Sequence, residues 1–182
     1  DFDATSGQLT PTETHYQLVD GAPKPGPRHF AFHPAGTFAY SINELNSTIS
    51  TYRYANGKLT NLQTITTLPA DYNGPNNCAD IHLHPNGRFL YGSNRGHNSI
   101  AIFSINQDGT LVPSGHTATQ GTVPRNFALS PDGAFLFAAN QNSNNISSFK
   151  LDAESGALSF IGSTKVATPV CLAFAVPAGQ MD

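Results

Sequence analysis

Apolar and polar residues alternate along most of the chain, in short runs separated by turn-forming residues. Runs such as TFAYSI, TISTYRY and SIAIFSI place aromatic and β-branched side chains at about every second position, a pattern typical of strands with one buried face. The start and stop signals of an amphipathic helix do not occur along the sequence. The pattern therefore predicts an all-β protein.

One segment pattern occurs three times, over residues 33–59, 84–111 and 130–158. Each copy follows a short apolar segment and contains a Pro-x-Gly turn, a turn rich in Asn and Ser, and a third turn at a glycine. A spacing of about 50 residues is that of propeller blades rather than of helical solenoids. Four strands joined by short hairpins make one antiparallel blade, so the sequence predicts a β-propeller.

The repeat also predicts how much of a propeller the chain contains. We expect blades at about 28–68, 79–118 and 125–166, the tail of an earlier blade at 1–20, and a single closing strand at 170–176. About three and a half blades cannot close a ring of the usual four to eight. We therefore expect one partial propeller domain over 1–182, which a missing propeller half or a second copy of the chain completes.

Composition and charge narrow the class of protein. The chain is 38% hydrophobic and 12% charged, with a formal net charge of −3, which favours a soluble globular protein without the basic surface of a nucleic-acid binder. No apolar run is long enough to cross a membrane. Cys78 and Cys171 lack the spacing of a metal site or a redox motif. We interpret them as small side chains in a reducing, cytoplasmic setting, and the sequence implies neither a metal nor an organic cofactor.

Alternate connections of an antiparallel blade lie on opposite faces, so the entry to the first strand and the Asn-rich turn share one mouth of the central channel. Asn43, Asn94 and Asn140 fill one position of this turn in all three blades, which indicates a structural role. The next position varies, as a binding site on a repeated scaffold would. The candidates gathered at this mouth are Arg28, His29, Glu44, Asp80, Arg95, His97, Arg125 and Gln141.

The chemistry of these residue types suggests an anion site with an acid–base group. The guanidinium groups of Arg28 and Arg95 suit two-pronged capture of a phosphate or carboxylate. Glu44 between them can act as a general base or acid, or can form a purely structural ion pair. His29, His97, Arg125, Gln141 and Asp80 are candidates for substrate binding, against the alternative of ordinary loop residues. His33 and His84 recur with the fold and are expected to be structural.

The strings GPRHFAFHP, INELNS, SNRGH and PRNFA resemble the seven-bladed lactonase family, which groups bacterial 6-phosphogluconolactonases with fungal 3-carboxy-cis,cis-muconate lactonizing enzymes. The resemblance implies a C-terminal half, about three and a half of seven blades. By motif match it implies catalytic roles for Arg28, Glu44 and Arg95. It also implies a histidine from an earlier blade, which would precede residue 1, so the chain by itself is not expected to hold a complete site.

Three functions fit these observations. The resemblance and the arginines favour hydrolysis of an anionic sugar lactone, such as 6-phosphogluconolactone, by the intact protein. Cyclisation of a carboxy-muconate would use the same arginines on carboxylates. A non-catalytic binding propeller is the third interpretation, although the chain has no Trp and hence no WD pair of the WD40 type.

Overall fold

The computed structural model describes residues 1–11 and 24–175. Its regular structure consists of twelve strands and, within those residues, no helix: β1 (Pro27–Phe32), β2 (Phe38–Asn43), β3 (Thr48–Ala55), β4 (Lys58–Thr66), β5 (Cys78–Leu83), β6 (Phe89–Asn94), β7 (Ser99–Ile105), β8 (Leu111–Ala118), β9 (Pro124–Leu129), β10 (Phe135–Asn140), β11 (Asn145–Leu151) and β12 (Leu158–Lys165). Consequently, no helix capable of spanning a membrane occurs in this part of the chain.

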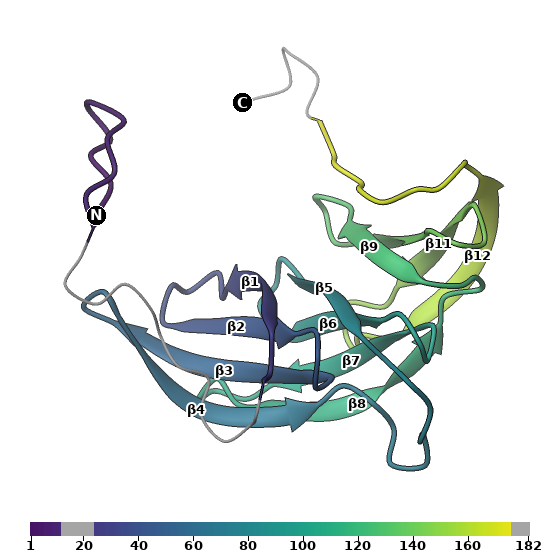
Figure 1. Cartoon of the computed structure of the whole chain (residues 1–182), viewed down its shortest axis with the longest axis horizontal. Coiled ribbons are helices and arrows are strands. Elements are labelled where there is room, and N and C mark those ends of the chain that lie inside the picture. Colours follow the sequence, from purple (N-terminus) through teal and green to yellow (C-terminus); the bar gives the residue numbers. More distant parts are fainter. Residues whose placement is uncertain (12–23, 176–182) are drawn as a thin grey trace.

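The strands form three antiparallel sheets of four, each made of consecutive strands: β1 to β4, β5 to β8 and β9 to β12. Figure 1 shows the sheets side by side like the blades of a fan, with β1, β5 and β9 along the inner edge and β4, β8 and β12 outside. The predicted fold, a partial β-propeller of four-stranded antiparallel blades, is confirmed.

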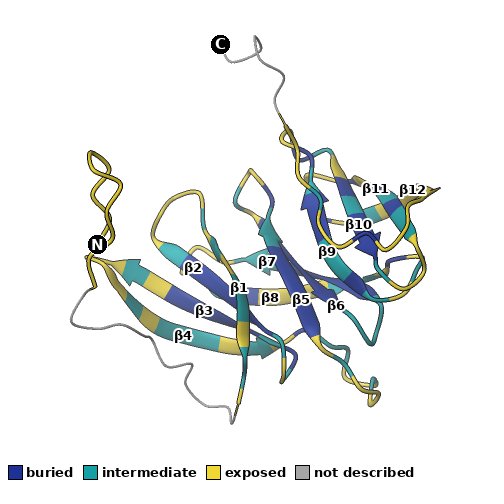
Figure 2. Ribbon diagram, turned by 45° about the horizontal axis from the view of Figure 1, so that its top comes forward, coloured by how far each residue is buried: buried dark blue, intermediate teal, exposed yellow. Residues whose placement is uncertain are grey.

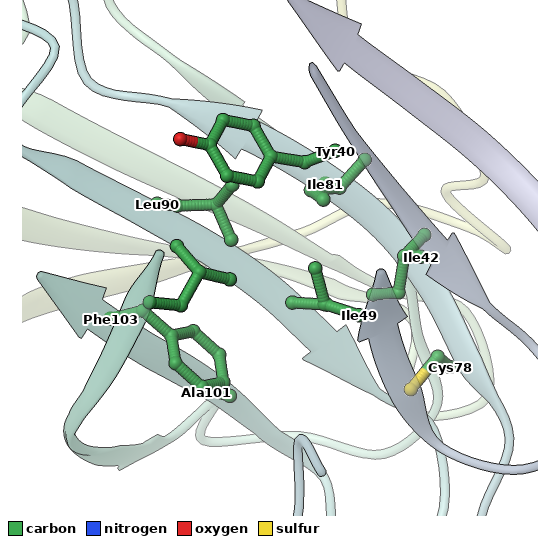
Figure 3. Close-up of a cluster of buried hydrophobic side chains, with 9 residues drawn as sticks. Tyr40, Ile42, Ile49, Cys78, Ile81, Leu90, Ala101 and Phe103 are labelled. Carbon is green, nitrogen blue, oxygen red and sulfur yellow. The ribbon is translucent and has the colours of Figure 1, made fainter. Parts of the chain in front are cut away.

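The hydrophobic core lies between the blades. Tyr40, Ile42 and Ile49 of the first blade pack against the second blade in one buried cluster (Figure 3). The second blade packs against the third through the equivalent positions, Tyr91 and Ile100 among them. Burial of each large apolar side chain contributes about 1.5–3 kcal/mol, so each blade is stabilised by its neighbours.

Polar contacts repeat at the same interfaces. The buried Tyr40 hydroxyl donates to the carbonyl of Gly109 in the next blade at 3.0 Å. His33 Nε2 lies 2.9 Å from the Gly87 carbonyl across the same interface. The second and third blades are joined by equivalent contacts, Tyr91 to Gly156 and His84 to Gly133. The structural interpretation of His33 and His84 is therefore confirmed.

The inner strand of the first blade exposes aromatic side chains, whereas the inner strand of the second blade is largely buried. Phe30 and Phe32 on β1 are 45% and 52% exposed, and their rings stack against Tyr52 and Tyr54 of β3. The equivalent strand of the second blade, β5, is largely buried against the first blade (Figure 2). The first blade thus presents an aromatic surface at the place where the second blade has an interface.

Two parts of the predicted domain differ from expectation. The closing strand expected at 170–176 is absent from its described part, since residues 170–175 form no strand. The first strand of a blade pairs with the second strand of the same blade. The described residues contain no second strand that could pair with 170–175. The expected blade tail at 1–20 is described only over residues 1–11, which form a small hairpin with one bridge between Phe2 and Leu9; its remainder lies outside the described residues.

Candidate active site

The loops divide between two faces as the repeat predicts. On one face, the turn after the second strand bonds to the chain entering the first: Glu44 N–H donates to Gly26, Arg95 N–H to Asn77 and Gln141 N–H to Val123. On the other face, the Pro-x-Gly turn bonds to the third strand, as in the contact of Tyr54 N–H with Thr37. The candidate residues therefore share the mouth at which the inner strands begin.

Glu44 lies between two arginines from different blades. Its Oε1 accepts a hydrogen bond from Arg95 Nη2, and its Oε2 lies 3.6 Å from Arg28 Nε. The three side chains are 32%, 14% and 19% exposed for Glu44, Arg95 and Arg28, so the cluster is sheltered and still reachable from solvent. The structure thus brings together the three side chains to which the sequence assigned catalysis.

Backbone carbonyls fix both guanidinium groups. Arg28 Nη1 donates to the carbonyl of Ala79 at 2.7 Å, and Arg95 Nη2 donates to that of Cys78 at 2.9 Å. Both carbonyls belong to β5, so this strand aligns arginines from the first and second blades. Burial raises the pKa of the Cys78 thiol to about 11, which keeps it protonated and unreactive.

The mouth carries an excess of positive charge. Burial and the charge of Arg95 lower the pKa of Arg28, and Arg125 on β9 adds to this effect, whereas Glu44 opposes it. Asp80 also opposes it, so three guanidinium groups act together with two carboxylates, Glu44 and Asp80, and positive charge exceeds negative charge by one. Such an arrangement favours an anion that adds the missing negative charge.

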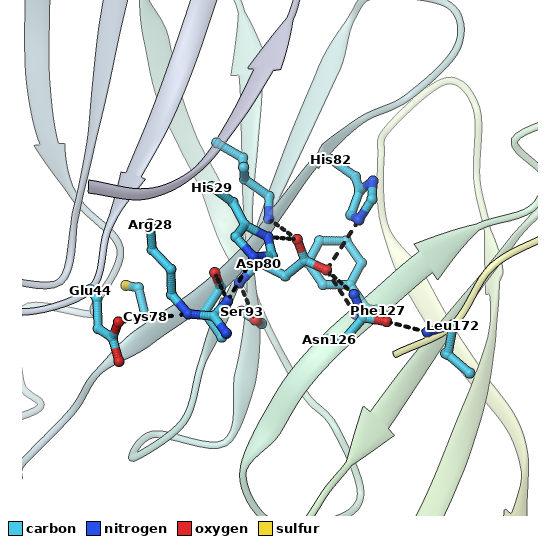
Figure 4. Close-up of polar contacts among 12 residues, drawn as sticks. Arg28, His29, Glu44, Cys78, Asp80, His82, Ser93, Asn126, Phe127 and Leu172 are labelled. Atoms are coloured by element: carbon cyan, nitrogen blue, oxygen red, sulfur yellow. Dashed lines mark hydrogen bonds and ion pairs between the residues drawn. The ribbon is translucent and has the colours of Figure 1, made fainter. Parts of the chain in front are cut away.

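A second cluster lies beside the first and centres on Asp80, whose side chain is 3% exposed. Its carboxylate accepts hydrogen bonds from the backbone of Ile81 and Phe127 and from the side chain of Asn126. His29 Nδ1 lies 2.5 Å from Oδ1 and His82 Nε2 3.2 Å from Oδ2. Figure 4 shows this convergence of β1, β5 and β9 on one carboxylate.

The surroundings of Asp80 make the stability of the fold depend on pH. Burial by itself would raise the pKa of Asp80, but hydrogen bonds and positive charge from His82 and His29 outweigh it and lower the pKa to about 2. An aspartate in the unfolded chain has a pKa of about 3.9. Because the folded state holds this proton more weakly, the ionised carboxylate stabilises the fold above about pH 4, and the effect disappears as the pH falls to about 2.

We therefore expect Asp80→Asn to flatten the loss of stability between about pH 4 and pH 2, by ~2 kcal/mol in the free energy of unfolding. Urea unfolding of the chain at a series of pH values measures it. Asp71→Asn, which changes an exposed loop carboxyl, is the matched control and should keep the wild-type dependence. Equal slopes for all three proteins would contradict the prediction.

Two members of the Asp80 cluster, Asn126 and His82, were not among the site residues predicted from the sequence, and His82 had been interpreted as structural. The signal for Asn126 was present, because the third residue of the inner strand differs among the blades: His29, Asp80 and Asn126. The same kind of variation singled out Glu44 and Arg95. His82 follows Asp80 by two residues and so lies on the same face of the strand.

Two sequence candidates lie apart from the clusters. The His97 imidazole contacts Ser99 Oγ at 2.7 Å and stacks edge-on against Tyr72 and His116. These neighbours do not fit the anion-binding role expected of His97. Burial together with the charge of His116 lowers the pKa of His97. Gln141 occupies the turn of the third blade that corresponds to Glu44, half-buried, with its backbone bonded to Val123.

A hollow adjoins the arginine side of the site. It has a volume of about 330 Å³ and is lined by Pro75, Asn76, Asn77, Arg95, Gly96 and Val123. Arg95 Nε is buried and has no hydrogen-bond partner within the residues that the structure describes. A small polar molecule placed in this hollow would lie beside Arg95.

Comparison with known proteins agrees with this architecture. The family described as lactonase, 7-bladed beta-propeller, matches residues 1–174. A 6-phosphogluconolactonase of Serratia proteamaculans is 41% identical over 157 residues, which are 84% of this chain and 46% of that protein. The chain spans less than half of the length of the curated relatives it matches.

Solved structures show the same relation. The periplasmic gluconolactonase of Pseudomonas aeruginosa superposes with a TM-score of 0.82 at 36% identity, covering 87% of this chain and 45% of that one. A Lactobacillus plantarum protein gives a TM-score of 0.84 at 37% identity, with 92% and 49% covered. The family match over nearly the whole sequence, together with the three blades, shows that the chain belongs to the seven-bladed β-propeller lactonase family.

Proposed function

We propose that the closed propeller containing this chain hydrolyses an anionic sugar lactone, such as 6-phosphogluconolactone, at this mouth. The observation that carries the proposal is the position of Glu44, a carboxylate between the guanidinium groups of Arg28 and Arg95. The names of the relatives, 6-phosphogluconolactonase and gluconolactonase, support the same substrate class.

The arginines account for binding of an anionic ring. A hydrogen bond between charged groups contributes about 1.5–3 kcal/mol, and a guanidinium can present two donors to one phosphate. Arg28 donates Nη1 to Ala79 and turns Nε toward Glu44, and its Nη2 has no hydrogen bond among the described residues. Arg28 can therefore take a substrate oxygen and keep its support from the backbone.

The chemistry requires two proton transfers. The oxygen of a water molecule forms a bond to the lactone carbonyl carbon as a base takes its proton, and the carbonyl oxygen becomes an oxyanion. The bond from that carbon to the ring oxygen then breaks, and the ring oxygen takes up a proton to give the open hydroxy acid. Glu44 can accept the first proton and return it, and Arg28 and Arg95 stabilise the oxyanion or hold the anionic substituent.

A closed channel is part of this proposal, because charge stabilisation is strongest where water is excluded. The aromatic surface of β1 supports closure, since Phe30 and Phe32 occupy the positions that Ile81 and Leu83 fill in the interface of the second blade. The remaining half of a propeller or a second copy of the chain would cover it. The cytoplasmic location stays a prediction, as one structural relative is a periplasmic protein.

The test compares a charged with an uncharged lactone. Arg28→Ala in the closed propeller is expected to lower kcat/KM for 6-phosphogluconolactone by about 10- to 150-fold, the equivalent of one lost charged hydrogen bond. The loss for gluconolactone, which has no phosphate, should be several-fold smaller if Arg28 holds the phosphate. Proton release in a pH-stat, corrected for spontaneous hydrolysis, follows both reactions.

Arg88→Ala is the matched control, because Arg88 is exposed and pairs with Glu154 rather than with the mouth. It should leave both rates unchanged. Unchanged turnover of both lactones by Arg28→Ala would refute the proposed site. Turnover of a carboxy-muconolactone in place of either sugar lactone would move the function to the cyclisation of carboxy-muconates.

A further inference from the structure

The third residue of the inner strand lies at an equivalent place in each blade, and these residues bond to one another. His29 and Asn126 both contact the carboxylate of Asp80, which lies between them (Figure 4). Asn126 in turn accepts a hydrogen bond at 2.6 Å from the backbone of Leu172. A row of polar contacts therefore connects successive blades along the channel.

Connection of the blades does not by itself require an ionised residue. Asn126 receives the N–H of Leu172 with a neutral amide, in the same way that Asp80 receives the N–H of Phe127. The pair formed by His29 and Asp80 therefore exceeds what this structural role needs. The His29 side chain is also 41% exposed, so one edge of its ring can meet a ligand.

The contacts of His29 determine which of its nitrogens can act as a base. A carboxylate only accepts hydrogen bonds, so Asp80 holds the imidazole proton on Nδ1 and leaves a lone pair on Nε2. Nε2 lies 3.1 Å from Arg28 Nη1. Nη1 has two protons, and its two partners are the Ala79 carbonyl and this lone pair. The basic nitrogen thus points at the guanidinium that also faces Glu44.

We propose that His29 is a second acid–base catalyst of the lactone hydrolysis, with Asp80 as its positioning residue; this rests on the function proposed above. When Arg28 Nη1 turns from Nε2 to a substrate oxygen, the Nε2 lone pair becomes free. A water molecule beside Nε2 then gives its proton to that nitrogen as the water oxygen bonds to the carbonyl carbon. The imidazolium, stabilised by Asp80, then gives a proton to the ring oxygen as the ring bond breaks. His29 and Glu44 flank the same guanidinium, so the site holds two groups that can take up and return a proton.

The tautomer of His29 tests the positioning without any turnover. In the 182-residue chain, ¹⁵N NMR of the imidazole nitrogens should show a protonated Nδ1 and an unprotonated Nε2. In Asp80→Asn the amide lacks the negative charge that favours a proton on Nδ1, so the fraction of the Nδ1–H tautomer is expected to fall. A proton on Nε2 in the wild-type chain would overturn the proposal.

Turnover by the closed propeller tests the catalytic role. His29→Ala is expected to lower kcat by about 10²- to 10⁴-fold, and added imidazole should restore part of the loss, which a purely structural defect would not allow. His33→Ala is the matched control, because it removes another imidazole of the first blade that bonds to the second blade. It should keep the wild-type kcat.

The possible results separate the two proposals. Absence of lactone turnover by the wild-type closed propeller would overturn the proposed function, whatever the tautomer of His29. Turnover that His29→Ala leaves intact would overturn only the role of His29. A loss in His29→Ala that imidazole does not rescue, matched by an equal loss in His33→Ala, would identify both histidines as structural and would also overturn it.

Discussion

Glu44→Gln in the closed propeller is expected to lower kcat for an anionic lactone by about 10²- to 10⁴-fold, the usual contribution of a positioned acid–base group. The amide has nearly the same shape but exchanges no proton. It also removes the negative charge between Arg28 and Arg95. The mouth then becomes more positive, so KM for a phosphorylated lactone should stay constant or fall. Steady-state kinetics with 6-phosphogluconolactone measures both constants.

A fall in kcat without a rise in KM distinguishes catalysis from binding. Glu154→Gln is the control, because Glu154 is 86% exposed and forms its ion pair with Arg88, and it should change neither constant. If Glu44→Gln raised KM and left kcat intact, Glu44 would be a binding residue rather than an acid–base group. If Glu44→Gln had the kcat and KM of the wild type, the only role left for Glu44 would be the structural ion pair.

Gly109→Ala is expected to cost about 3–4 kcal/mol of the free energy of unfolding. Gly109 has a φ of +85°, and a Cβ there would lie 2.3 Å from the ring of Phe38 in the neighbouring blade. The left-handed backbone costs roughly 1–2 kcal/mol for a residue with a Cβ, and overpacking adds about 1–3 kcal/mol. Urea unfolding of the 182-residue chain measures the change.

The chain provides its own control for this substitution. Gly57 makes the equivalent turn in the first blade with a φ of +74°, but no atom lies within 4 Å of the place of its Cβ. Gly57→Ala should therefore cost only the backbone part, roughly 1–2 kcal/mol. Equal costs at the two glycines would show that the contact between Phe38 and Gly109 does not stabilise the interface.

Much of the fold was accessible from the sequence because it depends on local spacing. The turns recur at fixed places, and the alternation of hairpins assigns each loop to one face whatever the packing. Arg28, Glu44 and Arg95 could therefore be assigned to one mouth in advance. The prediction of a closing strand at 170–176 was wrong over its described residues. It depended on a match in local pattern, and such a match does not supply the partner strand that a β-strand needs.

The rest of the site depends on distances between blades, which no spacing within one blade contains. The Asp80 cluster forms because the third residues of β1, β5 and β9 meet, and the connection of two of them to one carboxylate is visible only in three dimensions. His97 was assigned to the anion site because it follows Arg95 by two residues. The loop that precedes β5 has no counterpart of its length before β9, and its Tyr72 stacks against the His97 ring.

The glycine turn of each blade gives the assembly a polarity. Gly109 and Gly156 are covered by a phenylalanine ring of the preceding blade, Phe38 and Phe89, whereas Gly57 has open space before it. The contact is thus heterologous: one face supplies the ring and the opposite face supplies the turn that receives it. A contact between the same face of two copies does not reproduce this arrangement, because two first blades would bring together two uncovered glycine turns. A further blade that joined the first blade head to tail would have room for an aromatic side chain over Gly57.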